Sequence, residues 1–266
     1  MTADPATVVL LDGRAQPPTE LVGAKAASLD TMRRLGLPVP PAFCVPASVC
    51  AARGALAEAV TAGLAWLRQQ SGPVRVSVRS SPTVSMPGML DTVLDVAPED
   101  ALPAVEAVLA SWDAPRSVAY RRHRQLGDAA ATAVIVQAMV SGVRDDASGA
   151  GVAFSRNPLT GADELFGEWR RGSRGDAVVS GTAESAPLHV LAGELPTVHA
   201  ALAAAARLLE HHYADMQDIE FTVESGQLWL LQTRTATRSP RAALRVALSL
   251  YTAGVLDETE LLNLSL

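Results

Sequence analysis

Hydrophobic positions recur along this chain with two periods, one typical of helices and one typical of strands. Leu29, Met32 and Leu35 follow helical spacing, which predicts an amphipathic helix over residues 23–35. In "VRVSVRSS" the valines alternate with polar residues, which predicts a strand over residues 74–81. Each of these two elements therefore has one apolar side that can face a core.

Helices and strands alternate over the rest of the chain as well. The pattern predicts helices at residues 47–70, 99–125, 196–212 and 239–264, a buried strand at 132–140, short strands in "GAGVAFSRNPLTG" and "DELFGEW", and a hairpin in "DIEFTVESGQLWLLQTR". A turn at residues 157–161 joins the two short strands. Without an internal repeat, this mixture predicts an α+β fold, and the length allows two lobes.

Polar side chains share one face of the predicted hairpin. Asp218 and Glu220 lie on one side of the first strand, and Gln232 and Arg234 on one side of the second, because side chains alternate along a strand. A three-residue turn at 224–226 places both pairs on the same side of the sheet. Two carboxylates, an amide and a guanidinium suit Mg²⁺ and a triphosphate. The alternative is a solvated outer face, which shows the same alternation.

The composition excludes several classes of protein. The 266 residues carry a formal net charge of -6 with a pI near 5.4, which gives no overall positive field for nucleic acid. The N-terminal segment lacks the features of a signal peptide, and no stretch reaches the ~20 apolar residues of a membrane span. We therefore expect a cytoplasmic protein without a membrane partner. Cys44 and Cys50 match no common zinc or redox spacing, and we expect buried thiols.

Lys25 is the single lysine among 22 lysine and arginine residues. A lysine ammonium is a compact point charge and an arginine guanidinium is a planar fork, so a site shaped for one rejects the other. A chain that otherwise uses arginine would keep a lysine where arginine does not fit. The alternative is chance survival on a helix surface.

A segment rich in serine, proline and glycine, "VRSSPTVSMPGMLDT", follows the strand at residues 74–81. Arg79 lies near the end of that strand, Gly88 lies in the loop, and Thr92 lies at the end of the segment. Backbone N–H groups of such a loop can hold phosphate groups. A single glycine is a weak signal, and an ordinary surface loop has the same composition.

Four segments, taken in order, resemble one family. They are "LVGAKAASLDTMRRLGLPVPPAFCV", "VSVRSSPTVSMPGMLDTVLDV", "GVAFSRNPLTGADELFGEW" and "DMQDIEFTVESGQLWLLQTRTATR". They are similar to successive motifs in the N-terminal ATP-grasp region of the pyruvate, phosphate dikinases, whose wider family includes phosphoenolpyruvate synthases and rifampicin phosphotransferases. The resemblance covers the chain from about residue 20 to 255, and "SMPGMLDT" favours the dikinase branch.

The resemblance implies an ATP-grasp fold of the α+β class, in which the nucleotide binds between two lobes. One lobe would comprise residues 1–137 with the phosphate loop, and the other residues 138–236 with the hairpin, followed by a helical segment at 237–266. The dikinases insert a sizeable helical subdomain where this chain has only residues 97–110. We therefore expect most of that subdomain to be missing.

Matched motif by motif, the resemblance assigns two groups of residues to ATP. The phosphates would be contacted by Lys25, Arg79 and Arg234, which would also act in catalysis. Gly88 and Thr92 would match the family's phosphate-binding loop. Cations that neutralise spread negative charge are what phosphoryl transfer chiefly requires of a protein.

The resemblance also implies a base site and a metal site. The segment "VQAMV" matches the family's adenine hinge, so Gln137 and Met139 would hold the base with the backbone around them. Glu220 and Gln232 would bind Mg²⁺, and Asp218 would lie beside them.

The phosphate acceptor is not evident in this sequence. The family's phosphohistidine lies in a "TSHA"-like motif, and no such motif surrounds His123, His189, His199, His211 or His212. One hypothesis is a component that cleaves Mg-ATP, with AMP as product, and passes a phosphoryl or pyrophosphoryl group to a histidine on a separate phosphohistidine-domain protein. The alternatives are a kinase that acts directly on a small molecule and a nucleotide-binding regulatory module without catalysis.

Overall fold

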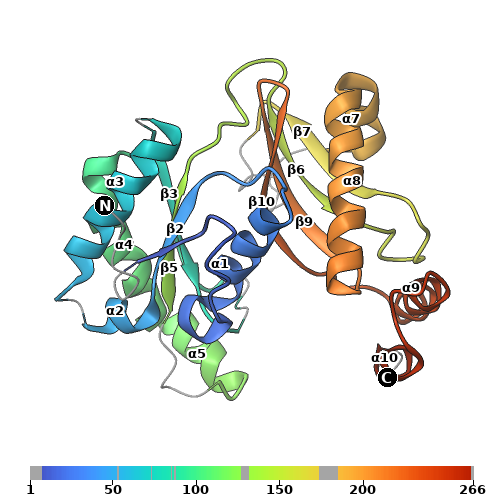
Figure 1. The fold of residues 1–266 in the computed structure, drawn as a ribbon, viewed down its shortest axis with the longest axis horizontal. Helices are drawn as coiled ribbons and strands as arrows, with labels where there is room; N and C mark the ends of the chain where they lie inside the picture. Colours follow the sequence, from blue (N-terminus) through green and yellow to red (C-terminus); the bar gives the residue numbers. More distant parts are fainter. Residues whose placement is uncertain are drawn as a thin grey trace. The chain divides into compact units, whose positions relative to one another are not determined.

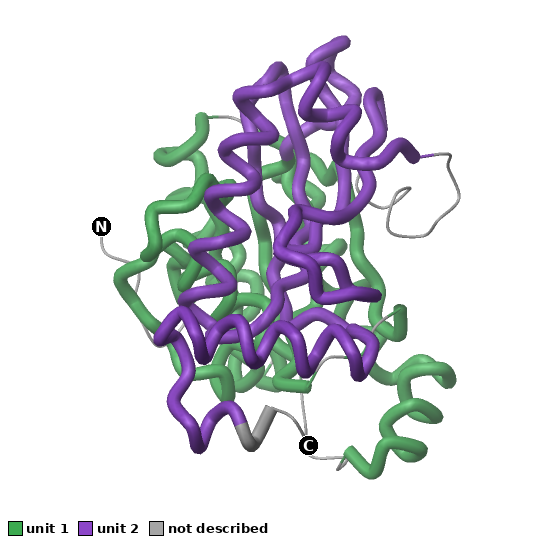
Figure 2. The backbone as a smooth tube through the Cα atoms, turned by 90° about the vertical axis from the view of Figure 1, so that its right-hand side faces the viewer, with its two compact units in different colours: residues 1–139 green, residues 140–266 purple. Residues whose placement is uncertain are grey.

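The computed structural model describes residues 8–52, 54–72, 74–84, 86, 88–126, 132–173 and 185–264. The chain forms two compact units, Met1–Met139 and Val140–Leu266, shown in different colours in Figure 2. Each unit has its own antiparallel five-stranded sheet with helices packed on it. This architecture confirms the predicted α+β class and agrees with the ATP-grasp fold that the resemblance implied.

Unit 1 has a sheet with the strand order β1-β2-β5-β3-β4. Its strands are β1 (Val9–Leu10), β2 (Ala42–Val45), β3 (Val76–Ser81), β4 (Thr92–Val96) and β5 (Ala133–Ala138). Its helices are α1 (Thr19–Arg34), α2 (Ala47–Ala52), α3 (Leu56–Ser71), α4 (Ala101–Ala110) and α5 (Pro115–His123), with short 3-10 turns η1 (Pro98–Asp100) and η2 (Ser111–Asp113).

Helices cover both faces of the sheet of unit 1 (Figure 1). On one face, Val76 and Val78 belong to a buried core that includes residues of α2, α3 and α4. Cys44 points to the opposite face by strand alternation, and its thiol donates to the carbonyl oxygen of Val22 in α1 at 3.6 Å. Arg79 follows the same alternation, so the predicted strand arginine points away from the core face, toward the side that α1 covers.

Unit 2 has a sheet with the strand order β10-β9-β6-β7-β8. Its strands are β6 (Gly149–Phe154), β7 (Phe166–Arg171), β8 (Ala186–Pro187), β9 (Gln217–Glu224) and β10 (Gln227–Thr235). Its helices are α7 (Leu188–Glu194), α8 (Pro196–Tyr213), α9 (Pro240–Thr252) and α10 (Glu258–Leu264).

Helices α7 and α8 lie together on one face of the sheet of unit 2 (Figure 1). Trp169 identifies this face, because its indole N–H donates to Glu194 of α7. Phe221 shares the face, since both Phe221 and Trp169 pair with Gly151 across the strands. Asp218 and the other even-numbered residues of β9 therefore point to the opposite face.

The helical prediction for residues 99–125 is confirmed over most of the range, although the helix is not continuous. The chain forms η1, α4, η2 and α5 there, and the break before α5 falls at Ala114, which has φ -61 and ψ 144. Proline at position 115 disfavours a helical conformation at the preceding residue, which explains the break. The hydrophobic pattern did not indicate β4 or α7. No helix in the described ranges is long and apolar enough to cross a membrane.

Candidate functional site

Helix α1 is kinked at Gly23, and the turn that follows the kink contacts the end of β3. Lys25 lies in this turn. Gly23 has φ 78, and a Cβ atom there would lie 1.7 Å from the carbonyl oxygen of Ser81. The Ala26 N–H donates to the Ser81 hydroxyl at 3.1 Å, and the Ala24 N–H donates to the carbonyl of residue 82 at 3.0 Å. Glycine is thus required for the close approach that brings half-buried Lys25 to the strand end.

Arg79 and Thr92 are direct cross-strand neighbours. They pair across β3 and β4, so their side chains share one face of the sheet. Arg79 is half-buried and Thr92 is exposed. Gly88 lies in the segment that joins the two strands and has φ 70, a conformation that favours glycine. Unit 1 therefore brings Lys25, Arg79 and Thr92 to the β3 region by strand pairing and by the packing of α1.

Gln137 and Met139 differ in what they offer a ligand. The Gln137 side chain is 1% exposed, and its Nε2 atom donates to the carbonyl oxygen of Pro40 at 3.2 Å. The Gln137 amide is therefore engaged inside unit 1, and its assignment to the adenine base stays a prediction. Met139 follows β5, is half-buried, and donates its backbone N–H to Arg75 at 2.9 Å.

The polar side chains of the hairpin of unit 2 share one face, as predicted, but the turn and the strand pairing differ from those expected. Ser225 and Gly226 form a two-residue turn with φ values of 50 and 77, so the expected three-residue turn is wrong. A bulge between Leu230 and Gln232 then shifts the pairing by one residue. A two-residue turn with one bulge gives the same face parity as a three-residue turn, and the polar side chains still meet on one face.

Asp218 and Arg234 form an ion pair on this face. The Nε and Nη2 atoms of Arg234 donate to Oδ2 of Asp218 at 2.8 and 2.7 Å. Asp218 is 6% exposed, and its Oδ1 atom is buried without a hydrogen-bond partner in the part of the chain that the structure describes. Burial raises the pKa of Asp218, Arg234 acts in the opposite direction, and Glu220 raises it further. An additional cation at Oδ1 would relieve this desolvation.

Glu220 and Gln232 lie directly opposite each other in the next row of the same face. Glu220 is half-buried and Gln232 is 9% exposed. Among the described residues no group of three or more His, Cys, Asp and Glu side chains is placed to hold a metal. Mg²⁺ commonly uses one or two carboxylates together with water and phosphate oxygens, so Asp218 and Glu220 with the Gln232 amide fit such an ion.

Two further charged residues share this face and were missed by the sequence analysis. Glu168 pairs with Val152 across β7 and β6, and Val152 pairs with Glu220 across β6 and β9. Glu168 therefore lies in the same row as Glu220 and accepts a hydrogen bond from the Ser185 hydroxyl. Arg170 lies one row further along. The alternation in "FGEWRR" around buried Trp169 was the available signal.

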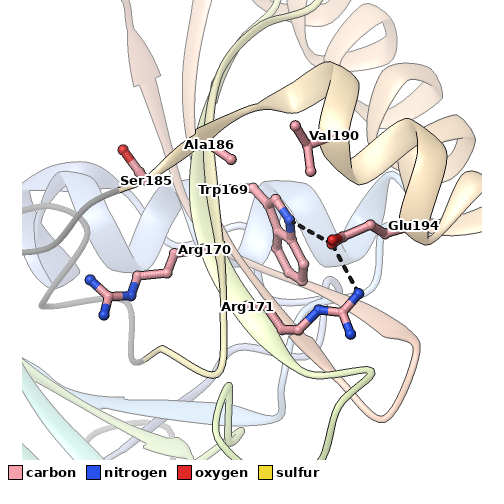
Figure 3. A pocket seen from close by; sticks show the side chains of 7 residues that line it. All are labelled: Trp169, Arg170, Arg171, Ser185, Ala186, Val190 and Glu194. Carbon is pink, nitrogen blue, oxygen red and sulfur yellow. Dashed lines mark hydrogen bonds and ion pairs between the residues drawn. The ribbon is translucent and has the colours of Figure 1, made fainter.

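A hollow of about 320 Å³ lies at the edge formed by β7, β8 and α7 (Figure 3). Oε2 of Glu194 accepts from Trp169 Nε1 at 3.2 Å and pairs with Arg171 Nη2 at 3.2 Å. Figure 3 shows Arg170 pointing to the other side of the strand from Trp169. Because the Glu194 carboxylate is already engaged, we assign no ligand to this hollow. It is lined by Trp169, Arg170, Arg171, Ser185, Ala186, Val190 and Glu194.

The chain belongs to a family of ATP-binding domains from phosphotransferases. Its residues 51–199 and 196–253 match the family model described as pyruvate phosphate dikinase, AMP/ATP-binding domain. Pyruvate, phosphate dikinase of Clostridium symbiosum is 30% identical over 346 residues, covering 90% of this chain and 40% of the relative. Pyruvate, phosphate dikinase 2 of Zea mays is 30% identical over 343 residues, covering 90% of this chain and 39% of the relative.

The chain thus spans about 40% of the length of these curated relatives. The alignment with the Clostridium symbiosum protein extends over more positions than this chain has residues, so the relative has additional residues inside the aligned region. Among solved structures, D-cycloserine synthetase DcsG is similar with a TM-score of 0.40 and 14% identity, covering 85% of this chain and 68% of that one.

Proposed function

We propose that this chain binds Mg-ATP, cleaves it between the α and β phosphates with release of AMP, and transfers the pyrophosphoryl group to a histidine on a separate phosphohistidine-domain protein. Where only a phosphoryl group stays on the histidine, the terminal phosphate passes to water or to inorganic phosphate. Membership of the dikinase ATP-binding family supports the nucleotide. The observation that carries the proposal is the polar face of unit 2. There a buried carboxylate oxygen of Asp218, beside Glu220 and Gln232, has no hydrogen-bond partner among the described residues.

In this proposal the residues of unit 2 hold the metal side of the nucleotide. Mg²⁺ would supply charge neutralisation and orientation of the phosphate oxygens. Glu220 and Gln232 would bind the ion, as expected from the sequence, and Asp218 Oδ1 would be a third oxygen. Arg234 orients Asp218 through its two hydrogen bonds and, with its side chain 48% exposed, retains N–H groups for a phosphate.

The residues of unit 1 would hold the phosphates and the base. Lys25 would place a point charge on the phosphates from the turn of α1 that follows the kink at Gly23, and Arg79 would act from β3. The segment with Gly88 and Thr92 would contribute backbone N–H groups. The adenine contact would rest on Met139 and neighbouring backbone groups, because the Gln137 amide is engaged with Pro40.

The positions of the histidines support an acceptor outside these residues. Four of them lie on α7 and α8, which cover the face of the sheet opposite to Asp218, and the fifth ends α5 in unit 1. A histidine on the covered side of the sheet is poorly placed to receive a phosphoryl group from a nucleotide on the other side. The histidines are His123, His189, His199, His211 and His212.

The test is product analysis with purified protein, Mg²⁺ and ATP labelled in the β or γ phosphate. With a candidate phosphohistidine-domain protein present, we expect AMP and an acid-labile label on that protein. Lys25→Arg should abolish labelling because the guanidinium does not replace the ammonium, whereas the matched swap Arg68→Lys, at an exposed position of α3, should not. Intact ATP and an unlabelled partner, with ATP binding demonstrated, would contradict the proposal. ADP formed with a small-molecule acceptor would favour a direct kinase instead.

A further inference from the structure

A network of hydrogen-bonded, buried polar side chains lies in unit 2, on the side of the sheet opposite to the face that carries Asp218. Arg156 Nε donates to Glu210 Oε1 at 2.9 Å, and Arg156 Nη2 pairs with the same oxygen at 2.8 Å. The second Glu210 oxygen accepts from the Ser155 hydroxyl at 2.6 Å. These hydrogen bonds therefore join α8 to the residues that directly follow β6.

The same network continues into both strands of the hairpin. The Gln217 N–H donates to the Ser155 hydroxyl at 3.0 Å, and the Ser155 N–H donates back to the Gln217 carbonyl at 2.9 Å. The Gln217 side chain accepts from the Thr233 hydroxyl at 2.9 Å and donates to the Asp215 carbonyl at 2.9 Å. All of these residues are buried, including Asp215, which contributes its backbone carbonyl, so the bonds are shielded from water.

The residues of the proposed metal and phosphate site are adjacent in sequence to members of this network. Gln217 directly precedes Asp218, and Thr233 lies between Gln232 and Arg234. Because strand side chains alternate, Gln217 and Thr233 point to the face opposite to the site. They fix the backbone of both strands from the opposite face of the sheet, at positions next to the site residues.

We propose that the Arg156, Glu210, Ser155, Gln217 and Thr233 network is the positioning device of the nucleotide site, holding the carboxylates of β9 and the amide and guanidinium of β10 in register for Mg-ATP. This inference rests on the proposed function. A buried ion pair such as Arg156 with Glu210 gives little net stability, since an apolar pair of similar volume is often as stable. Its expected contribution is a fixed geometry, and fixed ligand geometry is what a metal site requires.

Ser148 provides a matched control at the other end of the same strand. Ser148 directly precedes β6 and Ser155 directly follows it. The Ser148 hydroxyl accepts from the Ser225 N–H at 2.9 Å and donates to Asp145 at 2.6 Å, at the turn of the hairpin. Both serines are buried. Alanine at either position thus removes one acceptor of a hairpin N–H and one donor to a carboxylate, but only the Ser155 change lies beside the site.

The experiment compares Ser155→Ala with Ser148→Ala in the full chain. Binding of ATP is measured by calorimetry with Mg²⁺ and with EDTA, together with the thermal midpoint and hydrogen exchange of the β9 and β10 amides. Ser155→Ala should weaken Mg-ATP binding about tenfold, as outer-shell changes at metal sites do, while binding of metal-free ATP changes little. Ser148→Ala should leave both affinities within about twofold of wild type.

Thr233→Val keeps the test decisive if Ser155→Ala does not fold. It removes the hydroxyl between the two site residues of β10 without changing side-chain size, and we expect the same selective loss, rescued by Thr233→Ser. If the Ser155→Ala and Thr233→Val variants bind Mg-ATP as tightly as wild type and Ser148→Ala do, the positioning role is overturned and the proposed function is left intact. Wild-type protein that does not bind Mg-ATP would overturn both.

Discussion

Replacing Asp218 with asparagine separates ligand binding at this position from stability. Breaking a buried ion pair is costly chiefly when it leaves a buried charge unpaired. Here the remaining partner, Arg234, has a side chain that is 48% exposed, so water can solvate its guanidinium. The lost carboxylate was itself incompletely satisfied, since its Oδ1 atom has no hydrogen-bond partner in the described chain. We therefore expect the free energy of unfolding of metal-free Asp218→Asn to lie within about 1 kcal/mol of wild type.

The pH dependence has a definite sign. Burial raises the pKa of folded Asp218 above its unfolded value of about 3.9, so its stabilising contribution is complete below that pH and is lost as the pH rises through the folded pKa. At neutral pH the ionised carboxylate therefore lowers the stability of the metal-free protein. Asp218→Asn removes this titration, and its unfolding free energy should change less with pH in that window.

The assay is thermal unfolding with and without Mg-ATP. At a concentration of about 100 times Kd, ligand binding stabilises wild-type protein by about 2.7 kcal/mol, which corresponds to a midpoint shift of about 5–10 °C. Asp218→Asn should show little shift at the same concentration, while the control Asp145→Asn, at the turn of the hairpin, should keep it. Metal-free Asp218→Asn that is several kcal/mol less stable and keeps the full shift would refute the reasoning.

Three further predictions concern stability and reactivity. Gly23→Ala, at a positive φ with strand backbone 1.7 Å from the added Cβ, should lower the free energy of unfolding by more than about 3 kcal/mol. Gly36→Ala, at φ 76 with no atom of the described residues within 4 Å of the added Cβ, should lower it by about 1 kcal/mol, measured by denaturant titration. Hydrogen bonds from serine hydroxyls lower the pKa of Asp145, so its stabilising contribution is present above its unfolded pKa and lost as the pH falls through the folded value; midpoints of wild type and Asp145→Asn should converge in acid, and parallel curves would contradict this. Burial raises the pKa of Cys44, and that of Cys50 to about 12, so both thiols should resist a thiol reagent at pH 8 until denaturant is added; rapid labelling of native protein would count against their burial.

Much of the fold was predictable because its elements have clear periods. The alternation in residues 74–81 predicted β3. The helical spacing before residue 35 predicted α1, and the apolar run at 132–140 predicted β5. Short elements escaped this reasoning. The five residues of β4 form a strand because they pair with β3, and that pairing is a long-range interaction without a local period.

The arrangement of the candidate site was likewise predictable only in part. Alternation placed Asp218 and Glu220 on one side of their strand from the sequence alone. It did not indicate that Glu168, about fifty residues earlier in the chain, lies in the same row, because strand order is decided by packing between distant segments. Nor did it indicate that the Gln137 amide is engaged with Pro40.

By itself, the sequence determined the α+β class, the family resemblance, and the side chains that share each strand face. Those properties depend on local periodicity and on motif wording. The tertiary structure decided which of those faces α7 and α8 cover and how a two-residue turn and a bulge bring the polar side chains of the hairpin to one face. It also decided which carboxylate oxygen is buried without a hydrogen-bond partner in the described part of the chain. These properties arise where segments distant in the sequence meet, since burial and hydrogen bonding depend on every neighbour in space and a one-dimensional pattern specifies only the neighbours along the chain.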